Sequence, residues 1–340
     1  ADAIRRGRDL LAREQELFGA DDPLTLSTEG MLALAELRGG ERQQATQRFE
    51  DLLPRQVAVF GEDHPTCLTS MHNLLSAYLD ADRLEDAIEL CDRALTLRRR
   101  VFGEHHPETL GTLNTAAILQ LRQGKLEEAE KTFHDVIDAW DRQFGEGHPA
   151  RLSAMMNLVE VYARQGELEL AENMAREAKE GAERSFAQDH PRRLAARQTH
   201  GFALYDVGRY EEAVEELESV FEDQRRVLDP VHPSTMKTAD ILASAYIRLE
   251  RFADAEGVRV YVSDLVGTMP DPGPELAVFH RVNAAICAVS DGRSEDALAH
   301  LRAALEHGAR VRPFSANPLF APLFDNAEFH ELAAQLEEQR

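Results

Sequence analysis

A histidine recurs inside a short motif that is written three times along the chain. The motif reads FGEDHP, FGEHHP and FGEGHP, and its histidines are His64, His106 and His148. Two looser copies add His190 and His232, so that one histidine falls every 42 residues. Histidine is a common metal ligand and the side chain that most readily transfers protons near neutral pH. The series is therefore either a set of metal-binding or catalytic histidines or a structural joint that the chain repeats.

The spacing of the histidines favours the joint. If each copy joins a pair of helices, successive histidines lie at least one helix–helix distance apart, which is about 8–10 Å. Zinc needs all of its donors within about 2.0–2.3 Å of one ion. The sequence also has no G-x-x-x-x-G-K-[ST], G-x-S-x-G or H-E-x-x-H motif and no Cys/His cluster at metal spacing. We predict that this chain holds no catalytic residue, no cofactor and no metal.

Two more residue series share the 42-residue period of the histidines. One is formed by the prolines of the motif, and the other by small residues that lie between the motifs. The prolines are Pro23, Pro65, Pro107, Pro149, Pro191 and Pro233. The small residues are Ala45, Ala87, Ala129, Ala171, Ala213, Ala255 and Ala297. Because self-similarity at a fixed period is typical of repeat architectures, we interpret the chain as a repeat protein.

Each repeat reads as two amphipathic helices. In the copy that starts at Pro65, apolar residues fall at helical spacing from 68 to 78, and a second stripe runs from 84 to 95. The glycine of the FG pair is expected to end the second helix, and the proline to begin the next first helix. Almost nothing in the sequence alternates as a strand would. Pro54 lies inside a second helix, which we expect it to kink or shorten.

The period predicts an all-α solenoid of antiparallel helix pairs. We expect a repeat array at residues 1–266, with units that start near the six prolines of the series. A divergent last unit, 267–310, follows a Pro/Gly-rich joint, and 311–340 form a helical cap. Residues 1–20 read as the second half of a further unit, because Ala3 falls on the alanine series. We therefore expect a further domain upstream of the chain.

The composition of the chain limits the kinds of partner that it is expected to bind. With 38 Lys and Arg against 61 Asp and Glu, the formal charge is −23, so neither a nucleic-acid backbone nor an anionic membrane is an expected partner. No apolar run approaches the roughly 18 residues of a membrane span, and the charged start is unlike a signal peptide. Cys67, Cys91 and Cys287 are odd in number and lack C-x-x-C spacing, which favours a reducing, cytoplasmic location.

The stretch HPETLGTLNTAAILQLRQGKLEEAEKTF, together with the repeat length, resembles the kinesin-light-chain type of tetratricopeptide repeat. The resemblance covers about residues 1–310. It implies a right-handed superhelix whose first helices line a concave groove that binds peptides. The tail NPLFAPLFDNAEFHELAAQL resembles the endings of bacterial serine/threonine kinases that carry such repeats. It also reads as a terminal cap, in which Phe314, Phe320, Phe324 and Phe329 cover the last helix pair.

Polar and basic residues recur at the registers that this resemblance assigns to the groove. An asparagine there can hydrogen-bond either a peptide backbone or the neighbouring helix, and a row of arginines can bind carboxylates. The candidate partner-binding residues are Asn73, Asn114, Asn157, Arg122, Arg164, Lys237 and Arg248. Trp140, on a second helix, either fills the edge of the core or protrudes as an interface anchor.

The function that we expect is a protein–protein interaction scaffold without catalysis, which binds a peptide or a partner domain in the groove. Its leading context is the C-terminal region of a larger bacterial signalling protein, such as a serine/threonine kinase. Two alternatives stay open. One is the sensor array of a multidomain effector, either a nucleotide-binding switch ATPase or a protease, and the other is a stand-alone adaptor like the kinesin light chain.

Overall fold

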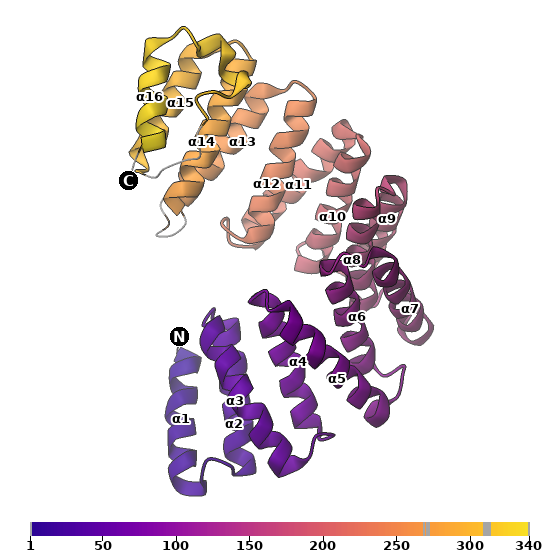
Figure 1. The fold of residues 1–340 in the computed structure, drawn as a ribbon. Coiled ribbons are helices and arrows are strands. Elements are labelled where there is room, and N and C mark those ends of the chain that lie inside the picture. The colour runs from indigo at the N-terminus through magenta and orange to yellow at the C-terminus, as the bar shows by residue number, and fades with distance from the viewer. Residues whose placement is uncertain (1, 268, 270–272, 309–313, 339–340) are drawn as a thin grey trace. The chain divides into compact units, whose positions relative to one another are not determined.

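The computed structural model describes residues 2–267, 269, 273–308 and 314–338, and the regular structure within them is entirely helical (Figure 1). The first helices of the repeats are α2 (Pro23–Arg38), α4 (Pro65–Asp80), α6 (Pro107–Arg122), α8 (Pro149–Gln165), α10 (Pro191–Val207), α12 (Pro233–Arg248) and α14 (Gly273–Ser290). The second helices are α1 (Asp2–Phe18), α3 (Arg42–Phe60), α5 (Leu84–Phe102), α7 (Leu126–Phe144), α9 (Leu168–Ser185), α11 (Tyr210–Val227), α13 (Phe252–Val266) and α15 (Ser294–Glu306). A 3-10 helix, η1 (Pro318–Leu323), and α16 (Ala327–Glu338) complete the described chain.

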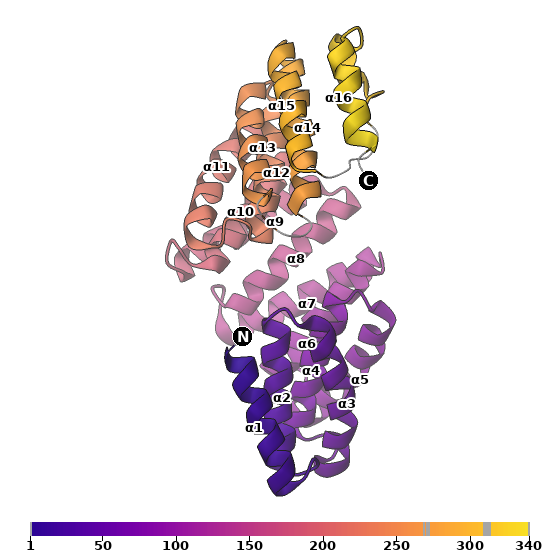
Figure 2. The ribbon, with the colours of Figure 1, turned by 90° about the vertical axis from the view of Figure 1, so that its left-hand side faces the viewer.

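The helices form two compact units, residues 1–161 and residues 162–340. In unit 1 each helix from α1 to α7 packs on the next, and in unit 2 the same holds from α9 to α16 (Figures 1 and 2). First helices of neighbouring repeats also touch one another, as α2 and α4 do in unit 1 and α10 and α12 in unit 2. The predicted all-α stack of helix pairs is thereby confirmed.

The repeated histidines are the N-caps of first helices. His106 Nδ1 accepts a hydrogen bond of 3.2 Å from the backbone N–H of Glu108, and the four other motif histidines accept the same bond at 3.1–3.2 Å. The imidazole also stacks on the phenylalanine that ends the preceding second helix, with ring centroids 4.6 Å apart for Phe102 and His106. In the first repeat, Asp22 caps α2 in the same way. The histidine series thus satisfies backbone groups at the joints, as the second interpretation predicts.

Four of the second helices end at a glycine with positive φ. Gly19, Gly61, Gly103 and Gly145 follow α1, α3, α5 and α7 at φ of 94°, 86°, 90° and 79°, a region that strains any residue with a Cβ. In the two looser motif copies, those of His190 and His232, the glycine is lost, and Phe186 and Leu228 follow their helices in an extended conformation instead. The predicted helix stop is confirmed where glycine is present.

The alanine series is buried between the packed helices. All seven alanines of the series are at most 1% exposed, so each second helix approaches its neighbours at a residue with no side chain beyond Cβ. Around them, larger residues such as Phe49, Met71 and Leu75 fill the core of unit 1, and Leu217, Leu242 and Val262 fill part of the core of unit 2. A larger residue at an alanine position would force the two helices apart.

The structure answers two local expectations, one on Pro54 and one on Trp140. Pro54 is expected to kink or shorten its helix; the shortening is wrong, because α3 has 19 residues, as α5 does. Its buried stripe continues through Leu52, Leu53 and Gln56, and this packing holds the helix together across the missing N–H. Trp140 is 4% exposed and stacks on His148 at 4.3 Å, so it fills the edge of the core.

The tail packs on the last helix pair. Phe314, Phe320 and Phe329 are buried in one cluster with residues of α14 and α15, whereas Phe324 is 38% exposed. Three of the four phenylalanines therefore cover the pair as predicted. The predicted Pro/Gly joint falls largely on residues 268 and 270–272, and the start of the predicted cap on 309–313, all of which lie outside the described residues.

The N-cap role of the histidines is testable with a matched pair of neighbours. We expect His106→Ala to lower the free energy of unfolding by about 1 kcal/mol, because the N–H of Glu108 loses its acceptor. His106→Asp should restore most of this loss, since Asp22 performs the same role in α2. Urea unfolding followed by circular dichroism measures both effects. The control is His105→Ala, which changes an exposed neighbour; equal losses for the two alanine variants would contradict the assignment.

Candidate functional site

All seven candidate binding residues lie on first helices, but they belong to different units. Unit 1 contains Asn73 on α4, Asn114 and Arg122 on α6, and Asn157 on α8. Unit 2 contains Arg164 on α8 and Lys237 and Arg248 on α12. The candidates therefore belong to two surfaces, one in each unit.

In unit 1, Arg122 joins two neighbouring first helices. Its Nη1 donates a hydrogen bond of 2.9 Å to the carbonyl of Leu79 in the last turn of α4, and it lies 3.6 Å from the carboxylate of Asp82. The last carbonyls of a helix have no partner within the helix, so Arg122 caps the preceding repeat. The guanidinium is 40% exposed and keeps further N–H groups for a ligand.

The asparagines of the candidate set are half-buried, and one of them has an unused acceptor. Asn114 Oδ1 is buried and has no hydrogen-bond partner in the described structure. His72 Nδ1, at the same register on the preceding first helix, is also buried without a partner. Burial lowers the pKa of His72, and the charge of Arg98 lowers it further. Buried polar atoms of this kind cost about 1–3 kcal/mol each when unpaired, so a ligand N–H that reached them would be bound favourably.

In unit 2, the two candidate cations of α12 lie on aromatic rings of the preceding repeat. Lys237 Nζ is 5.1 Å from the ring centroid of Phe202 on α10, and the guanidinium of Arg248 is 5.0 Å from that of Tyr210. Asp206 is close by: burial raises its pKa, and the charge of Lys237 opposes that rise. We call the surface formed by Phe202, Asp206, Lys237, Ile241 and Arg248 the α10–α12 face. It presents two exposed cations beside apolar and aromatic surface.

The second helices carry a polar cluster that the sequence reasoning missed. Arg83, just before α5, donates hydrogen bonds of 2.7 Å to both Glu50 and Asp86. Its guanidinium also lies 4.4 Å from the ring centroid of Tyr78, whose hydroxyl donates to Glu50 at 3.0 Å. Burial and the bond to Glu50 raise the pKa of Tyr78 to about 12. The signal that could have found this cluster is an arginine three residues before an acid at the start of second helices, as in Arg209 and Glu212.

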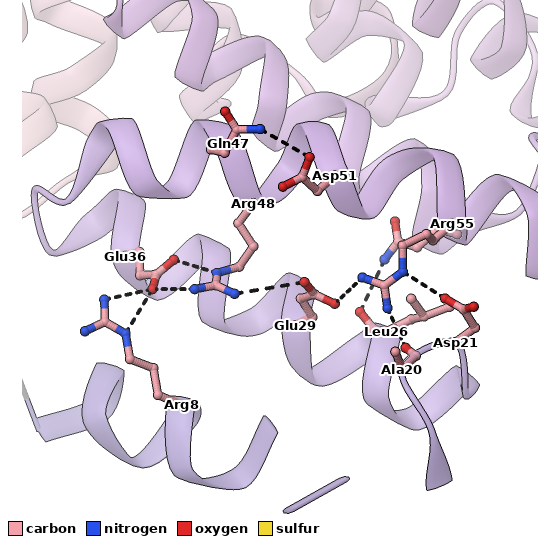
Figure 3. Close-up of polar contacts among 11 residues, drawn as sticks. Arg8, Ala20, Asp21, Leu26, Glu29, Glu36, Gln47, Arg48, Asp51 and Arg55 are labelled. Atoms are coloured by element: carbon pink, nitrogen blue, oxygen red, sulfur yellow. Dashed lines mark hydrogen bonds and ion pairs between the residues drawn. The ribbon is translucent and has the colours of Figure 1, made fainter. Parts of the chain in front are cut away.

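A chain of alternating charges joins α1, α2 and α3 (Figure 3). Its members are Arg8, Glu36, Arg48, Glu29, Arg55 and Asp21. The side chain of Glu36 is fully buried and accepts hydrogen bonds from Arg48 at 2.8 Å and from Arg8 at 2.9 Å. Burial raises the pKa of Glu36, but these two arginines outweigh it and hold the pKa below its ordinary value. The next repeat has Met71 and Tyr78 at the registers of Glu29 and Glu36. An acidic residue at a register that is apolar or aromatic in the next repeat is the sequence signal that could have predicted this chain of charges.

A second buried ion cluster ties α9, α10 and α11 together in unit 2. Glu216 is bonded to Lys179 and accepts a 2.9 Å hydrogen bond from Arg197, which also bonds Asp223 at 3.0 Å. Burial raises the pKa of Glu216, but His200, Lys179 and Arg197 together outweigh burial and bring that pKa to about 2. The nitrogens of buried His200 lie 3.5 and 3.7 Å from Glu172 and Glu216. These groups hold the backbone that presents the α10–α12 face.

Comparison with known families agrees with the repeat period. The sequence profile of the Tetratricopeptide repeat matches residues 76–133, 109–184 and 192–257, and a second profile of the same repeat matches 31–100. Together these matches cover more than half of the chain. The chain belongs to the tetratricopeptide repeat family.

Solved structures share this tetratricopeptide repeat fold. Nearly identical TPR-like repeats of a putative kinesin light chain from Podosopora anserina are 24% identical, with TM-score 0.51, over 61% of this chain and 99% of that one. The apo quorum sensor NprR from B. thuringiensis is 15% identical, with TM-score 0.65, over 89% and 82%. A STAND protein with a tetratricopeptide repeat sensor from Pyrococcus horikoshii is 15% identical, with TM-score 0.63, over 99% and 50%. No curated protein matches the sequence.

Two features of the described tetratricopeptide repeats bear on other kinds of site. Among the described residues, no three His, Cys, Asp or Glu side chains are grouped as metal ligands would be. No helix in the same part of the chain combines the length and apolar character that a membrane span needs. The chemistry that the repeats do present is that of recognition: exposed cations on aromatic rings and buried polar atoms beside first helices.

The ion cluster of Glu216 predicts a pH dependence. The folded pKa of about 2 lies below the ordinary 4.5, so the stabilisation is present above about pH 4.5 and is lost as the pH falls toward 2. The loss should be on the order of 3 kcal/mol. In Glu216→Gln, unfolding by urea at neutral pH should become easier, because Lys179 and Arg197 lose their partner. Its stability should then fall less between pH 5 and pH 3 than that of the wild type.

The control for this experiment is Glu215→Gln, which changes an exposed neighbour on the same helix. Its stability should follow the wild-type pH profile. If Glu216→Gln lost as much stability on acidification as the wild type, Glu216 would not carry the acid sensitivity.

Proposed function

We propose that this tetratricopeptide repeat chain is a protein–protein interaction scaffold without catalysis, which binds a peptide or partner domain on its first helices. The observation that carries the proposal is the α10–α12 face. Lys237 and Arg248 are exposed there, 11 positions apart on α12, in a chain with a net charge of −23. Exposed cations that persist on one helix face of so acidic a chain support a role in recognising acid.

The ligand class follows from the groups on this face. Lysine and arginine bind carboxylates through charge-assisted hydrogen bonds, and the aromatic rings beneath Lys237 and Arg248 limit their motion before a ligand arrives. Phe279, on the next first helix, is 51% exposed and offers apolar contact. An acidic peptide with apolar residues between its carboxylates complements this arrangement. In unit 1, Arg122 and Asn114 offer a second, smaller set of donors and acceptors.

The wider context that we propose is the C-terminal interaction region of a larger bacterial signalling protein, in the cytoplasm. The resemblance of the tail to serine/threonine kinases is its basis, and it stays a prediction. One observation favours the sensor alternative: 99% of this chain aligns with 50% of a STAND protein that has a tetratricopeptide repeat sensor. The reading frame upstream of the Ala1 codon distinguishes these contexts, since a kinase, a P-loop ATPase and a start codon each leave a different sequence there.

The binding proposal predicts the effect of a charge reversal. Lys237→Glu combined with Arg248→Glu should weaken binding of a fluorescein-labelled peptide that alternates Glu and Leu by at least about tenfold, or 1.4 kcal/mol. Fluorescence anisotropy measures the affinity, and circular dichroism checks that helicity is unchanged. The matched control is Arg176→Glu with Arg184→Glu, which makes the same charge change on the second helix α9. If both double variants bind like the wild type, the α10–α12 face is only a solvated edge.

A further inference from the structure

A groove lies on the second-helix side of unit 1, away from the first-helix surfaces of the proposed function. It has a volume of about 670 Å³ and lies between α3 and α5, with α4 beneath. We call it the α3–α5 groove. Its apolar walls are formed by Leu53, Val57, Leu74 and Leu90. The cluster of Glu50, Tyr78, Arg83 and Asp86 closes one end, and Arg93 lines the groove as well.

The same cluster of Glu, Tyr, Arg and Asp side chains occurs again four repeats later, in unit 2. Residues 168 positions on from the Arg83 cluster are Glu218, Tyr246, Arg251 and Asp254. Tyr246 bonds Glu218 through its hydroxyl, and the guanidinium of Arg251 lies 4.5 Å from the Tyr246 ring centroid. Arg251 also bonds Asp254 at 2.7 Å. The helices α11, α12 and α13 therefore repeat the arrangement of α3, α4 and α5.

In unit 2, side chains of the protein itself fill the space between the second helices. The guanidinium of Arg225 on α11 lies 4.2 Å from the ring centroid of Tyr261 on α13, and its Nε donates 2.9 Å to the Tyr261 hydroxyl. The ring of Phe221 meets that of Tyr261 edge to face, with centroids 5.8 Å apart. An aromatic ring and a cation side by side are thus the groups that fit the space between these two second helices.

In unit 1, the ring and the cation are missing from the positions that they occupy in unit 2. The counterparts of Phe221, Arg225 and Tyr261 are Leu53, Val57 and Arg93. No aromatic ring stands among these three, and Arg93 donates a 2.6 Å hydrogen bond to Glu62, at the joint that follows α3. The walls of the α3–α5 groove are consequently aliphatic, and the volume that the ring and the guanidinium fill in unit 2 is open.

The charges at the rim suit a cation. Arg225 in unit 2 is held by Glu222 at 2.7 Å. The groove has Pro54 where unit 2 has Glu222, and Glu89 where unit 2 has Gly257. The acidic residue therefore lies on α5 in unit 1, whereas in unit 2 it lies on α11, the counterpart of α3. Glu50 and Asp86 are both bonded to Arg83, whereas Glu89 has no cationic partner among the described residues. Pro54 lacks an N–H, which leaves the carbonyl of Glu50 as an additional acceptor.

We propose that the α3–α5 groove binds a partner segment that supplies an aromatic ring and an arginine or lysine side by side. These are the two groups that the chain supplies to itself at Tyr261 and Arg225. The ring packs between the aliphatic walls, where burial of apolar area favours it, and the cation faces Glu89 and the Glu50 carbonyl. This site is separate from the first-helix surfaces, and its occupant is basic, where theirs is acidic.

The experiment uses the full chain with methyl-labelled leucine and valine. The probe is the capped dipeptide N-acetyl-tyrosyl-arginine amide, and methyl NMR spectra are recorded during a titration. Ring-current shifts are expected at Leu53, Val57 and Leu90. N-acetyl-alanyl-arginine amide should bind at least about tenfold more weakly, because it lacks the ring. Absence of shifts at these methyl groups with the tyrosyl probe would overturn the proposal.

Two double variants test the groove by exchanging the groups between units. Val57→Arg with Arg93→Tyr recreates the filled arrangement of unit 2 and should weaken binding of the tyrosyl probe at least about tenfold. Arg225→Val with Tyr261→Arg opens the counterpart in unit 2, and the probe should then shift the methyl groups of Leu242 and Val258. Arg99→Tyr, which places a ring elsewhere on α5, is the control and should bind like the wild type. Unchanged affinity in the filled variant would contradict the proposal; if that variant does not fold, the wild-type methyl shifts decide.

Discussion

The repeated joint between helix pairs is the constraint on which the rest of the structure depends. A histidine caps the first helix through Nδ1 and stacks on the phenylalanine that ends the preceding second helix, as His106 does with Glu108 and Phe102. One side chain therefore satisfies a backbone donor and packs against the helix before it. Because the joint recurs along the chain with a period of 42 residues, neighbouring helix pairs within each unit share a common local backbone, and their chemistry differs mainly through side chains. A residue that suggested catalysis is instead the reason that the surfaces of neighbouring repeats line up.

Side chains at equal registers show how the common backbone is used. At the register of Tyr78, the first repeat has Glu36, buried among arginines, and the same position of a later repeat has Tyr246. At the register of Arg225 and Tyr261, unit 1 has Val57 and Arg93, and a groove opens there. A different residue at the same register can thus give an ion network, a filled contact or an open groove, while the fold stays the same. In this way one repeat architecture can offer different surfaces, such as the α10–α12 face on first helices, for which we propose an acidic ligand, and the α3–α5 groove on second helices, for which we propose a basic, aromatic one.

The helices were predictable from the sequence to a greater degree than the candidate sites. The prolines, the alanines and the FG pairs depend on local backbone geometry, which a period of 42 residues reveals directly. Pro54 was judged by a local rule, and the packing of Leu52, Leu53 and Gln56 overrode that rule. For Arg122, the sequence indicated an exposed cation at a groove, whereas the structure shows that one of its N–H groups caps Leu79 in the preceding repeat. The polar clusters around Arg83 and Glu216 were missed, because their partners come from other repeats.

By itself, the sequence determined that the chain is a tetratricopeptide repeat array, where its first and second helices begin, and that its histidines are joints. These features follow from interactions within a few residues, such as a helix cap, a helix stop or an amphipathic stripe, and so they can be predicted from short stretches of the sequence. Only the tertiary structure decided which side chains meet across repeats. Arg83 reaches Glu50, 33 positions earlier, and Arg225 reaches Tyr261, 36 positions later. Long side chains have several partners within reach at such separations, and the packing of neighbouring helices selects one of them. That selection left the α3–α5 groove open and its counterpart filled.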